Sequence, residues 1–358
     1  MTTTTTTTTA SALQAPAGTL LLRIGCVSVL VHLRAAIGCA VLAGAALLGV
    51  TAALAVGTVP MSPLRSLPAL VGVGDPADVL VVQRLRAPRL VAGLLVGAAL
   101  GVSGCLMQTL ARNRLATPGT VGIDDGATAF AVASVVGAST SLAPSAMALT
   151  GAATAAALTL GLAGGAGTSG YRFVVVGLGV GAVLGSITSL LLVRAPIDAA
   201  NAAFPWAVGS LSARPATPVT LLGYGLAGCL PLALLAGRRL TVLRLSDSVA
   251  AGLGVRVRAV RLAALAVAVV CAGLAVAVGG PLGMAALLAP EAARRVCGPH
   301  GVPVLGSALA GAALVLLADT AGRTFAAPVE VPAGLVTAVI GGPYLLWLLL
   351  ASRPRRLP

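Results

Sequence analysis

The sequence predicts an all-helical integral membrane protein with about ten transmembrane helices. Hydrophobic residues make up 58% of the 358 residues and charged residues only 9%, whereas about a quarter of the residues in a soluble domain are charged. The mean hydropathy is +1.03. Apolar runs of about twenty residues, the length that crosses a bilayer, follow one another along the chain. Composition alone therefore places the chain in a membrane.

Each predicted span is an apolar run bounded by charged residues, proline or glycine, and together the spans define a transmembrane domain at 36–351. The eighth run is too short to cross alone and is expected to be tilted or half-buried in protein. In chain order the predicted spans are 36–57, 90–111, 120–138, 145–165, 173–193, 216–236, 260–279, 284–297, 303–320 and 333–351.

Both ends of the chain are predicted to be cytoplasmic. A threonine run from Thr2 to Thr9, followed by small and polar residues, predicts a disordered tail over 1–35 and no secretory leader. Residues 352–358 form the second tail. All 23 basic residues are arginines, and with both ends inside, sixteen of them face the cytoplasm and seven face outward. The positive-inside rule favours this orientation.

The stretch Arg86–Ala127 carries the most specific pattern in the chain. Glycines at 93, 97 and 101 recur every four residues, which leaves a helix face without side chains where another backbone can pack. The stretch contains R-x-P-R, S-G-x-x-x-Q, R-N-R-L-A-T-P-G and G-x-x-x-G-A in that order. This order resembles the second span of permease subunits of bacterial ABC importers for iron-siderophore, haem and cobalamin complexes (FecCD type).

The resemblance extends over about 36–351 and implies a type II ABC importer permease fold in a bacterial cytoplasmic membrane. Two copies, or one copy and a paralogue, would surround a central path. Two copies of an ABC ATPase subunit would lie beneath them, with an extracytoplasmic substrate-binding protein above. We expect a ferric siderophore as cargo, with haem or cobalamin as alternatives. We expect no cofactor, no metal site and no nucleic-acid partner.

Arginines also gather on the predicted outer side. Arg86 and Arg89 flank the start of span two, and Arg323 follows Asp319 by four residues at the end of span nine. These arginines can snorkel to headgroups, or Arg323 can pair with Asp319; alternatively, they form a patch that receives carboxylates from an acidic partner. Because they match the family motifs R-x-P-R and A-D-x-x-x-R, the resemblance implies that these three arginines dock glutamates of the binding protein.

The longest basic connection, Arg238–Arg261, joins spans six and seven on the predicted cytoplasmic side. Ser246 can cap a short helix there, whose small residues Ala250 and Ala251 and apolar residues Val249 and Leu253 would face one way. Such a helix could lie on lipid headgroups. The run L-x-D-x-V-A-x-x-L-G-V instead resembles the family's coupling segment, which implies contact with the ATPase by Asp247, Val249, Ala250, Leu253 and Gly254.

Span five repeats the glycine spacing at 177, 181 and 185, which plain helix packing would also explain. In the family this span lines the translocation path. Small and hydroxyl-bearing walls would let a bulky chelate slide past without tight binding. Asn113 can instead cap a turn. The predicted pathway residues are Gln108, Asn113, Gly181, Gly185, Ser186 and Ser189.

Three features depart from the family pattern. Glu291 stands where the family has histidine, and we expect it to pair with Arg294 or Arg295 rather than to relay protons. Arg114 replaces a helix-stopping proline. Asp124-Asp125 replaces a serine pair; aspartate can accept a capping bond at a helix start as serine does, and its charge suits that position. A cation site is the alternative.

The residues also bear on other functional classes. A Walker A loop needs lysine, and the chain has none, so any ATP hydrolysis requires a separate subunit. Six single cysteines and two histidines lack metal-ligand spacing. An ion-driven secondary transporter would need ionisable groups at mid-membrane, where Asp319 and Glu291 are the candidates. A membrane enzyme would need a catalytic constellation, which the sequence does not show.

Overall fold

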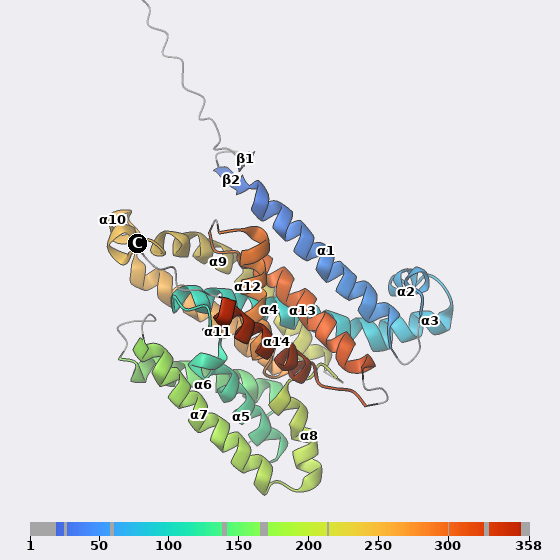
Figure 1. Ribbon diagram of the computed structural model, residues 1–358. Helices are drawn as coiled ribbons and strands as arrows, with labels where there is room; N and C mark the ends of the chain where they lie inside the picture. The colour runs from blue at the N-terminus through green and yellow to red at the C-terminus, as the bar shows by residue number, and fades with distance from the viewer. Residues whose placement is uncertain are drawn as a thin grey trace, which may run out of the picture.

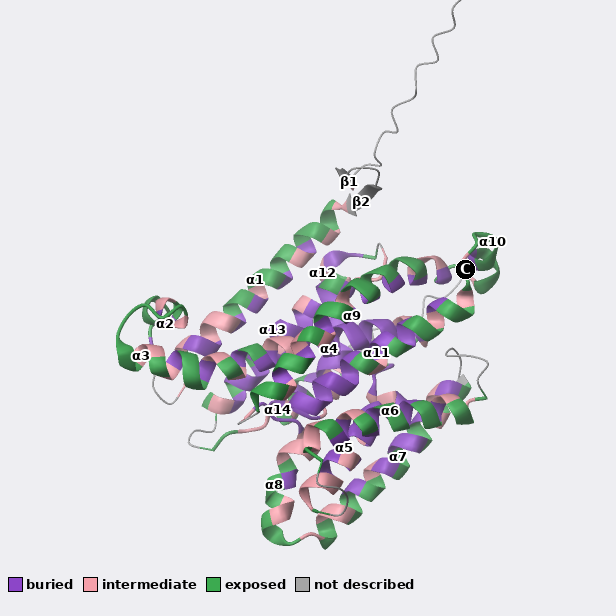
Figure 2. Ribbon diagram, turned by 180° about the vertical axis from the view of Figure 1, so that it is seen from behind, coloured by how far each residue is buried: buried purple, intermediate pink, exposed green. Residues whose placement is uncertain are grey.

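In the computed structural model, helix α4 (Ala87–Leu110) runs through the middle of a bundle of helices (Figure 1). The structure describes residues 19–24, 27–57, 61–137, 142–164, 171–212, 215–299, 301–325 and 329–351. Most of α4 is buried, as are most of α11 (Val257–Gly279) and α13 (Val304–Thr324). By contrast, α7 (Tyr171–Arg194) is largely exposed (Figure 2).

Seven helices in the described residues are long and apolar enough to cross a bilayer. In addition to α4, α7, α11 and α13, they are α1 (Leu33–Ala55), α6 (Pro144–Leu162) and α9 (Ala216–Leu243). Three shorter helices occupy the remaining predicted spans: α5 (Ile123–Val135), α12 (Gly283–Cys297) and α14 (Ala333–Ala351). The predicted helical membrane fold with about ten spans is therefore confirmed. The short eighth span is α12, which at 1.5 Å per residue is about 22 Å long.

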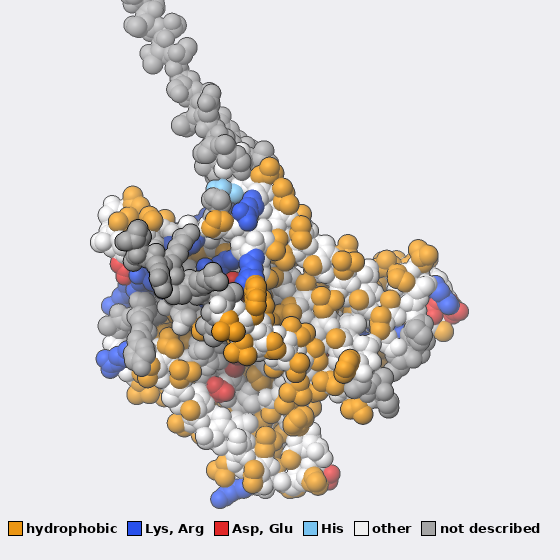
Figure 3. Space-filling model, viewed as in Figure 1, with side chains coloured by type: hydrophobic (Ala, Val, Ile, Leu, Met, Phe, Trp, Pro, Cys, Tyr) orange, Lys and Arg blue, Asp and Glu red, His pale blue; other side chains and the backbone are white. Residues whose placement is uncertain are grey.

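Short elements connect the spans. At one end of the bundle, α2 (Pro63–Leu70), α3 (Pro76–Leu80) and a π-helical turn η1 (Val81–Arg86) lead into α4, and Arg65 pairs with Asp78 at 2.9 Å. Figure 3 shows basic and acidic side chains together over this region. A 3₁₀ turn η2 (Gly119–Val121) precedes α5, and α8 (Ile197–Val208) precedes α9. Apart from α10 (Asp247–Gly252), none of these elements is predicted from the sequence, because each is too short to show a clear apolar period.

The chain before α1 differs from the predicted disordered tail of 1–35. Strands β1 (Thr19–Ile24) and β2 (Val27–His32) form an antiparallel pair, with Thr19 opposite His32 and Ile24 opposite Val27. Helix α1 then begins at Leu33. Period-2 alternation is weak in this apolar stretch, so its strand character is not evident from the sequence. Residues 1–18 and 352–358 lie outside the described residues.

Glycines let α4 touch its neighbours backbone to backbone. A Cβ atom at Gly97 would lie 2.3 Å from the Gly311 carbonyl oxygen, and one at Gly101 would lie 2.0 Å from that of Ser307, both on α13. At Gly104 the corresponding distance to the Ala286 carbonyl oxygen of α12 is 1.8 Å. The predicted backbone packing is therefore present at two of the three predicted glycines, whereas Gly93 meets side chains only.

We expect Gly101→Ala to lower the thermal unfolding midpoint of the purified protein. The added methyl group has no room beside Ser307, and overpacking of this kind costs about 1–3 kcal/mol. Gly44→Ala on α1 is the matched control, since a Cβ atom there meets nothing within 4 Å and alanine favours helix. Equal midpoints for the two variants would show that close backbone packing of α4 does not limit stability.

Candidate functional site

At the end of the bundle that carries α2 and α3, Arg89 binds two acidic residues. Its Nε and Nη2 donate to the Asp319 carboxylate of α13 at 2.9 Å each, and its Nη1 donates to Glu330 Oε2 at 3.0 Å. Paired guanidinium–carboxylate bonds of this kind are among the strongest in proteins. Asp319 is buried, so its carboxylate is held inside the bundle by these hydrogen bonds.

Arg323 and Arg86 lie in the same cluster. Arg323 Nε is 3.2 Å from Asp319 Oδ2, which is the local pair that the sequence allows. Arg86 is buried and donates to the Leu54 carbonyl oxygen. A Cβ atom at Gly57 would lie 3.3 Å from a guanidinium nitrogen of Arg86 and 3.8 Å from one of Arg323. The structure thus brings the three predicted docking arginines together, but each already contacts its own chain.

Glu330, in the loop before α14, was not among the predicted site residues. It accepts from Ser212 Oγ at 2.9 Å as well as from Arg89. Partial burial tends to raise the pKa of Glu330, but the hydrogen bonds from Arg89 and Ser212 outweigh it and hold the pKa below its ordinary value. Glu330 is 241 residues from Arg89 in the chain, so no local spacing could reveal the pair. We call Arg86, Arg89, Asp319, Arg323 and Glu330 the outer cluster.

At the opposite end, α10 is tied to two other helices through its first residue. Ser246 accepts from the Val249 backbone N–H at 3.1 Å, which confirms the predicted cap. Asp247 Oδ1 accepts from Arg112, just beyond α4, and from Arg261 on α11, both at 2.9 Å. Arg112 adopts a positive φ of 50°, a conformation that is costly for arginine and needs support from its contacts.

The side chains of α10 do not all face one way, so the predicted common face is wrong. Ala250 is fully buried against the bundle. Val249 and Leu253 are 46% and 66% exposed, and at i and i+4 they share one face of the helix. Gly254 follows with a φ of +81°, which suits glycine and ends the segment. A partner protein can therefore touch Val249 and Leu253 but not Ala250.

Glu291 forms the expected local pairs inside the same end of the bundle. Its carboxylate lies 3.2 Å from Arg294 and 3.3 Å from Arg295, which confirms the prediction. Arg114 also forms an ion pair with Glu291, at 3.7 Å, so two residues that differ from the family pattern contact each other.

Gln108 is buried, donates to the Leu287 carbonyl oxygen at 3.2 Å and accepts from Arg294. It therefore joins α4 to α12 in this conformation.

The glycines of α7 pack against the start of α5. A Cβ atom at Gly177 would lie 2.6 Å from the Thr120 carbonyl oxygen, and one at Gly181 would lie 2.6 Å from Asp125 Oδ2. At Gly185 the nearest atom is Asp125 Oδ1, at 3.8 Å. These glycines therefore face the interior of the chain, as plain helix packing predicts.

The remaining predicted pathway residues are exposed. Ser186 and Ser189 lie on the outer side of α7, where they donate to the carbonyl oxygens of Ala182 at 2.7 Å and Gly185 at 3.0 Å. Asn113 accepts from the Leu115 N–H at 2.9 Å, which is the turn that the sequence allows. Both serines thus present a satisfied, weakly polar surface.

The acidic pair at the start of α5 does not cap the helix. The N-cap is Gly122, with a φ of +78° and no side-chain cap bond. Asp124 and Asp125 follow in the first turn, where negative charge is favourable. Asp124 is buried, and its Oδ1 has no hydrogen-bond partner within the described part of the chain. The expectation of a helix-start position is correct, but the expected capping bond is absent at this turn.

Residues 45–351 match the FecCD transport family. The chain belongs to that family. The achromobactin transport system permease protein CbrC of Dickeya dadantii is 40% identical over 309 residues, which are 84% of this permease and 88% of that protein. The ferric enterobactin transport system permease protein FepG of Escherichia coli is 34% identical over 330 residues, which are 90% of this permease and 98% of that protein.

A solved structure of a metal-chelate-type ABC transporter in an inward-facing conformation has the same fold as this FecCD-family permease. The TM-score is 0.78 at 22% identity, covering 87% of this chain and 98% of that chain. The predicted family is thus confirmed: the protein is a multi-pass permease of the ABC importer family for iron chelates, siderophores and haem. It is a transport subunit and not an enzyme, and family membership implies an ATPase and a substrate-binding protein as partners.

We expect Arg89→Ala to destabilise this permease by up to about 3–5 kcal/mol, the cost of leaving a buried charge without a partner. The variant leaves buried Asp319 with Arg323 alone. Arg84→Ala is the control, because Arg84 is exposed on η1 and bears the same charge. The thermal unfolding midpoints of the two variants in detergent measure their stability. If the Arg89 variant is as stable as the Arg84 variant, the outer cluster does not hold the fold together.

Proposed function

We propose that this permease imports a ferric siderophore that a substrate-binding protein delivers. The names of its relatives support this cargo: CbrC is named for achromobactin transport, and FepG for ferric enterobactin transport. Haem is the second candidate, because the hemin transport system permease protein HmuU of Yersinia pestis is 37% identical over 281 residues. Cobalamin is a third cargo that the family resemblance allows.

The proposed mechanism rests on the exposed face of α10 and on the ion pairs of Asp247 that hold this helix to the bundle. Val249 and Leu253 present apolar side chains to the outside of the bundle, where an ATPase groove would receive them, and Gly254 lets the chain turn away. Asp247 holds the base of α10 to α4 through Arg112 and to α11 through Arg261. Movement of the ATPase would therefore reach two transmembrane helices at once.

The proposed path runs along α7, between this chain and a second copy or a paralogue. An open groove of about 400 Å³ lies on the exposed side of α7, lined by Ala182, Val183, Ser186, Ile187 and Leu190. The hydroxyls of Ser186 and Ser189 donate to carbonyl oxygens of their own helix, so they would bind a passing chelate only weakly. Gly181 and Gly185 keep α7 close to α5 behind this wall. Gln108 and Asn113 would act at the inner end, where Gln108 joins α4 to α12.

Binding-protein docking is proposed for the surface formed by the outer cluster and Arg84. Three arginines against two acids leave the outer cluster with a net positive charge. Arg84, which lies on η1 two residues before Arg86, is exposed. Glutamates of a binding protein would be attracted to this surface. We propose that this end faces outward from a bacterial cytoplasmic membrane, that α10 and both termini lie inside, and that two ATPase copies bind below; the arginine bias supports this orientation.

We expect Leu253→Glu to abolish co-purification with the cognate ATPase and to stop uptake, while the permease stays folded. The substitution places a charge on an exposed apolar contact and so disrupts docking without touching the core. Val71→Glu is the matched control: Val71 is 76% exposed at the opposite end of the bundle. The coupling proposal fails if the Leu253 variant retains its ATPase and transports at the control rate.

A further inference from the structure

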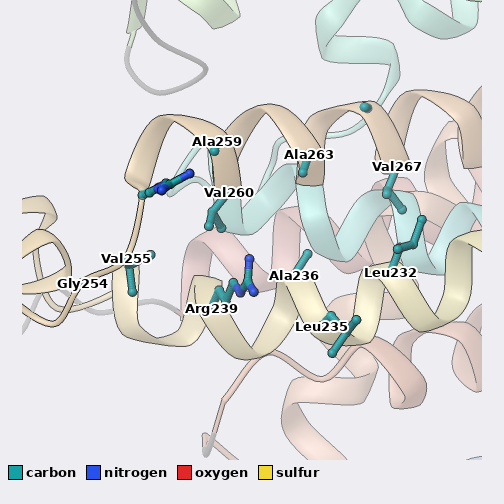
Figure 4. Close-up of a pocket in the computed structure, with 12 residues that line it drawn as sticks. Leu232, Leu235, Ala236, Arg239, Gly254, Val255, Ala259, Val260, Ala263 and Val267 are labelled. Carbon is teal, nitrogen blue, oxygen red and sulfur yellow. The ribbon is translucent and has the colours of Figure 1, made fainter.

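A groove opens between α9 and α11 at the end of the bundle that carries α10 (Figure 4). It encloses about 870 Å³, which is within the range of small-molecule sites. Its walls are apolar: α9 contributes Leu232 and Leu235, and α11 contributes Ala259, Ala263 and Val267. Alanines at i and i+4 on α11 lie one above the other, so they leave a slot along the helix.

Two arginines line one end of this groove. Arg239 comes from the last turns of α9, and Arg256 immediately precedes α11. Figure 4 shows the Arg239 side chain pointing into the space between the two helices. Both arginines are exposed. No acidic residue is among the described residues that line the groove, and nearby Asp247 already binds Arg112 and Arg261. The groove therefore combines a hydrocarbon slot with positive charge that no acidic residue in the described part of the chain pairs with.

We propose that this groove binds an anionic phospholipid, with an acyl chain between α9 and α11 and the phosphate on Arg239 and Arg256. Basic pockets between transmembrane helices at the headgroup level recognise anionic lipids in this way. Guanidinium groups also bind phosphate with two parallel hydrogen bonds. Under the orientation proposed above, the lipid comes from the cytoplasmic leaflet. Gly254 and Val255, which follow α10, also line the groove, so a bound lipid would touch the coupling segment.

The binding test uses the full-length permease in detergent, titrated with dioleoyl phosphatidylglycerol or dioleoyl phosphatidylcholine and followed by native mass spectrometry. We expect the native protein to retain phosphatidylglycerol in preference to phosphatidylcholine. Each arginine near a headgroup attracts an anionic lipid. Removal of both arginines should therefore lower the affinity for phosphatidylglycerol by roughly tenfold or more. The variant with Arg239→Ala and Arg256→Ala should show this loss.

A charge-matched control separates the groove from general attraction. Arg238 and Arg258 are exposed neighbours of the two groove arginines but do not line the groove. Arg238→Ala with Arg258→Ala removes the same charge and should leave phosphatidylglycerol affinity within about twofold, since attraction to a specific site needs the phosphate within reach. Equal losses in the two double variants would overturn the proposal.

A third variant tests the acyl-chain slot. Ala263→Phe would fill the slot and keep both arginines, so it should also lower phosphatidylglycerol retention. Unchanged retention in this variant, or no preference for phosphatidylglycerol in the native protein, would overturn the proposal. Loss of the co-purifying ATPase with unchanged lipid binding in the Arg239/Arg256 variant would assign these arginines to the ATPase instead. The lipid readout needs neither cargo nor ATPase, so it stands apart from the test of transport.

Discussion

The contact of α4 with α13 and α12 at backbone distance is the constraint on which the rest of this structure depends. Glycines at 97, 101 and 104 meet carbonyl oxygens of the facing helices where no side chain would fit. This approach fixes the register of α4. The first turn of α4 then meets Asp319 through Arg89, and its last turn meets α12 through Gln108.

Helix α4 therefore links the two ends where partners are proposed to act. Arg89 in its first turn belongs to the outer cluster and binds Asp319. Arg112, just beyond its last residue, binds Asp247 at the base of α10. The exposed α7 takes part in no such ion pair within the described residues, and it packs inward through its glycines and through Val180 and Leu184. A buried central helix and an exposed helix at the side of the bundle suit a gate in which one part moves against another.

The sequence predicts the spans well, because long apolar runs carry the strongest signal, but it predicts contacts only where they are local. Pairs at i+3 and i+4, such as Glu291 with Arg294 and Arg295, follow from helix spacing. The pairs Arg89–Glu330 and Arg112–Asp247 depend on tertiary packing. The burial of Ala250 depends on how α10 sits against α9, which composition cannot show. Helix α8 contains a proline and spans 12 residues, so its pattern is too short to predict.

The central claim is that this chain is a passive gate and that a separate ATPase supplies the energy. Transport of a radioiron-labelled siderophore into liposomes that contain the permease tests it most directly. We expect uptake only with the ATPase, ATP and the substrate-binding protein all present, and unchanged uptake when proton and sodium gradients are collapsed. Uptake by the permease alone, driven by either gradient, would contradict the account and identify a secondary transporter.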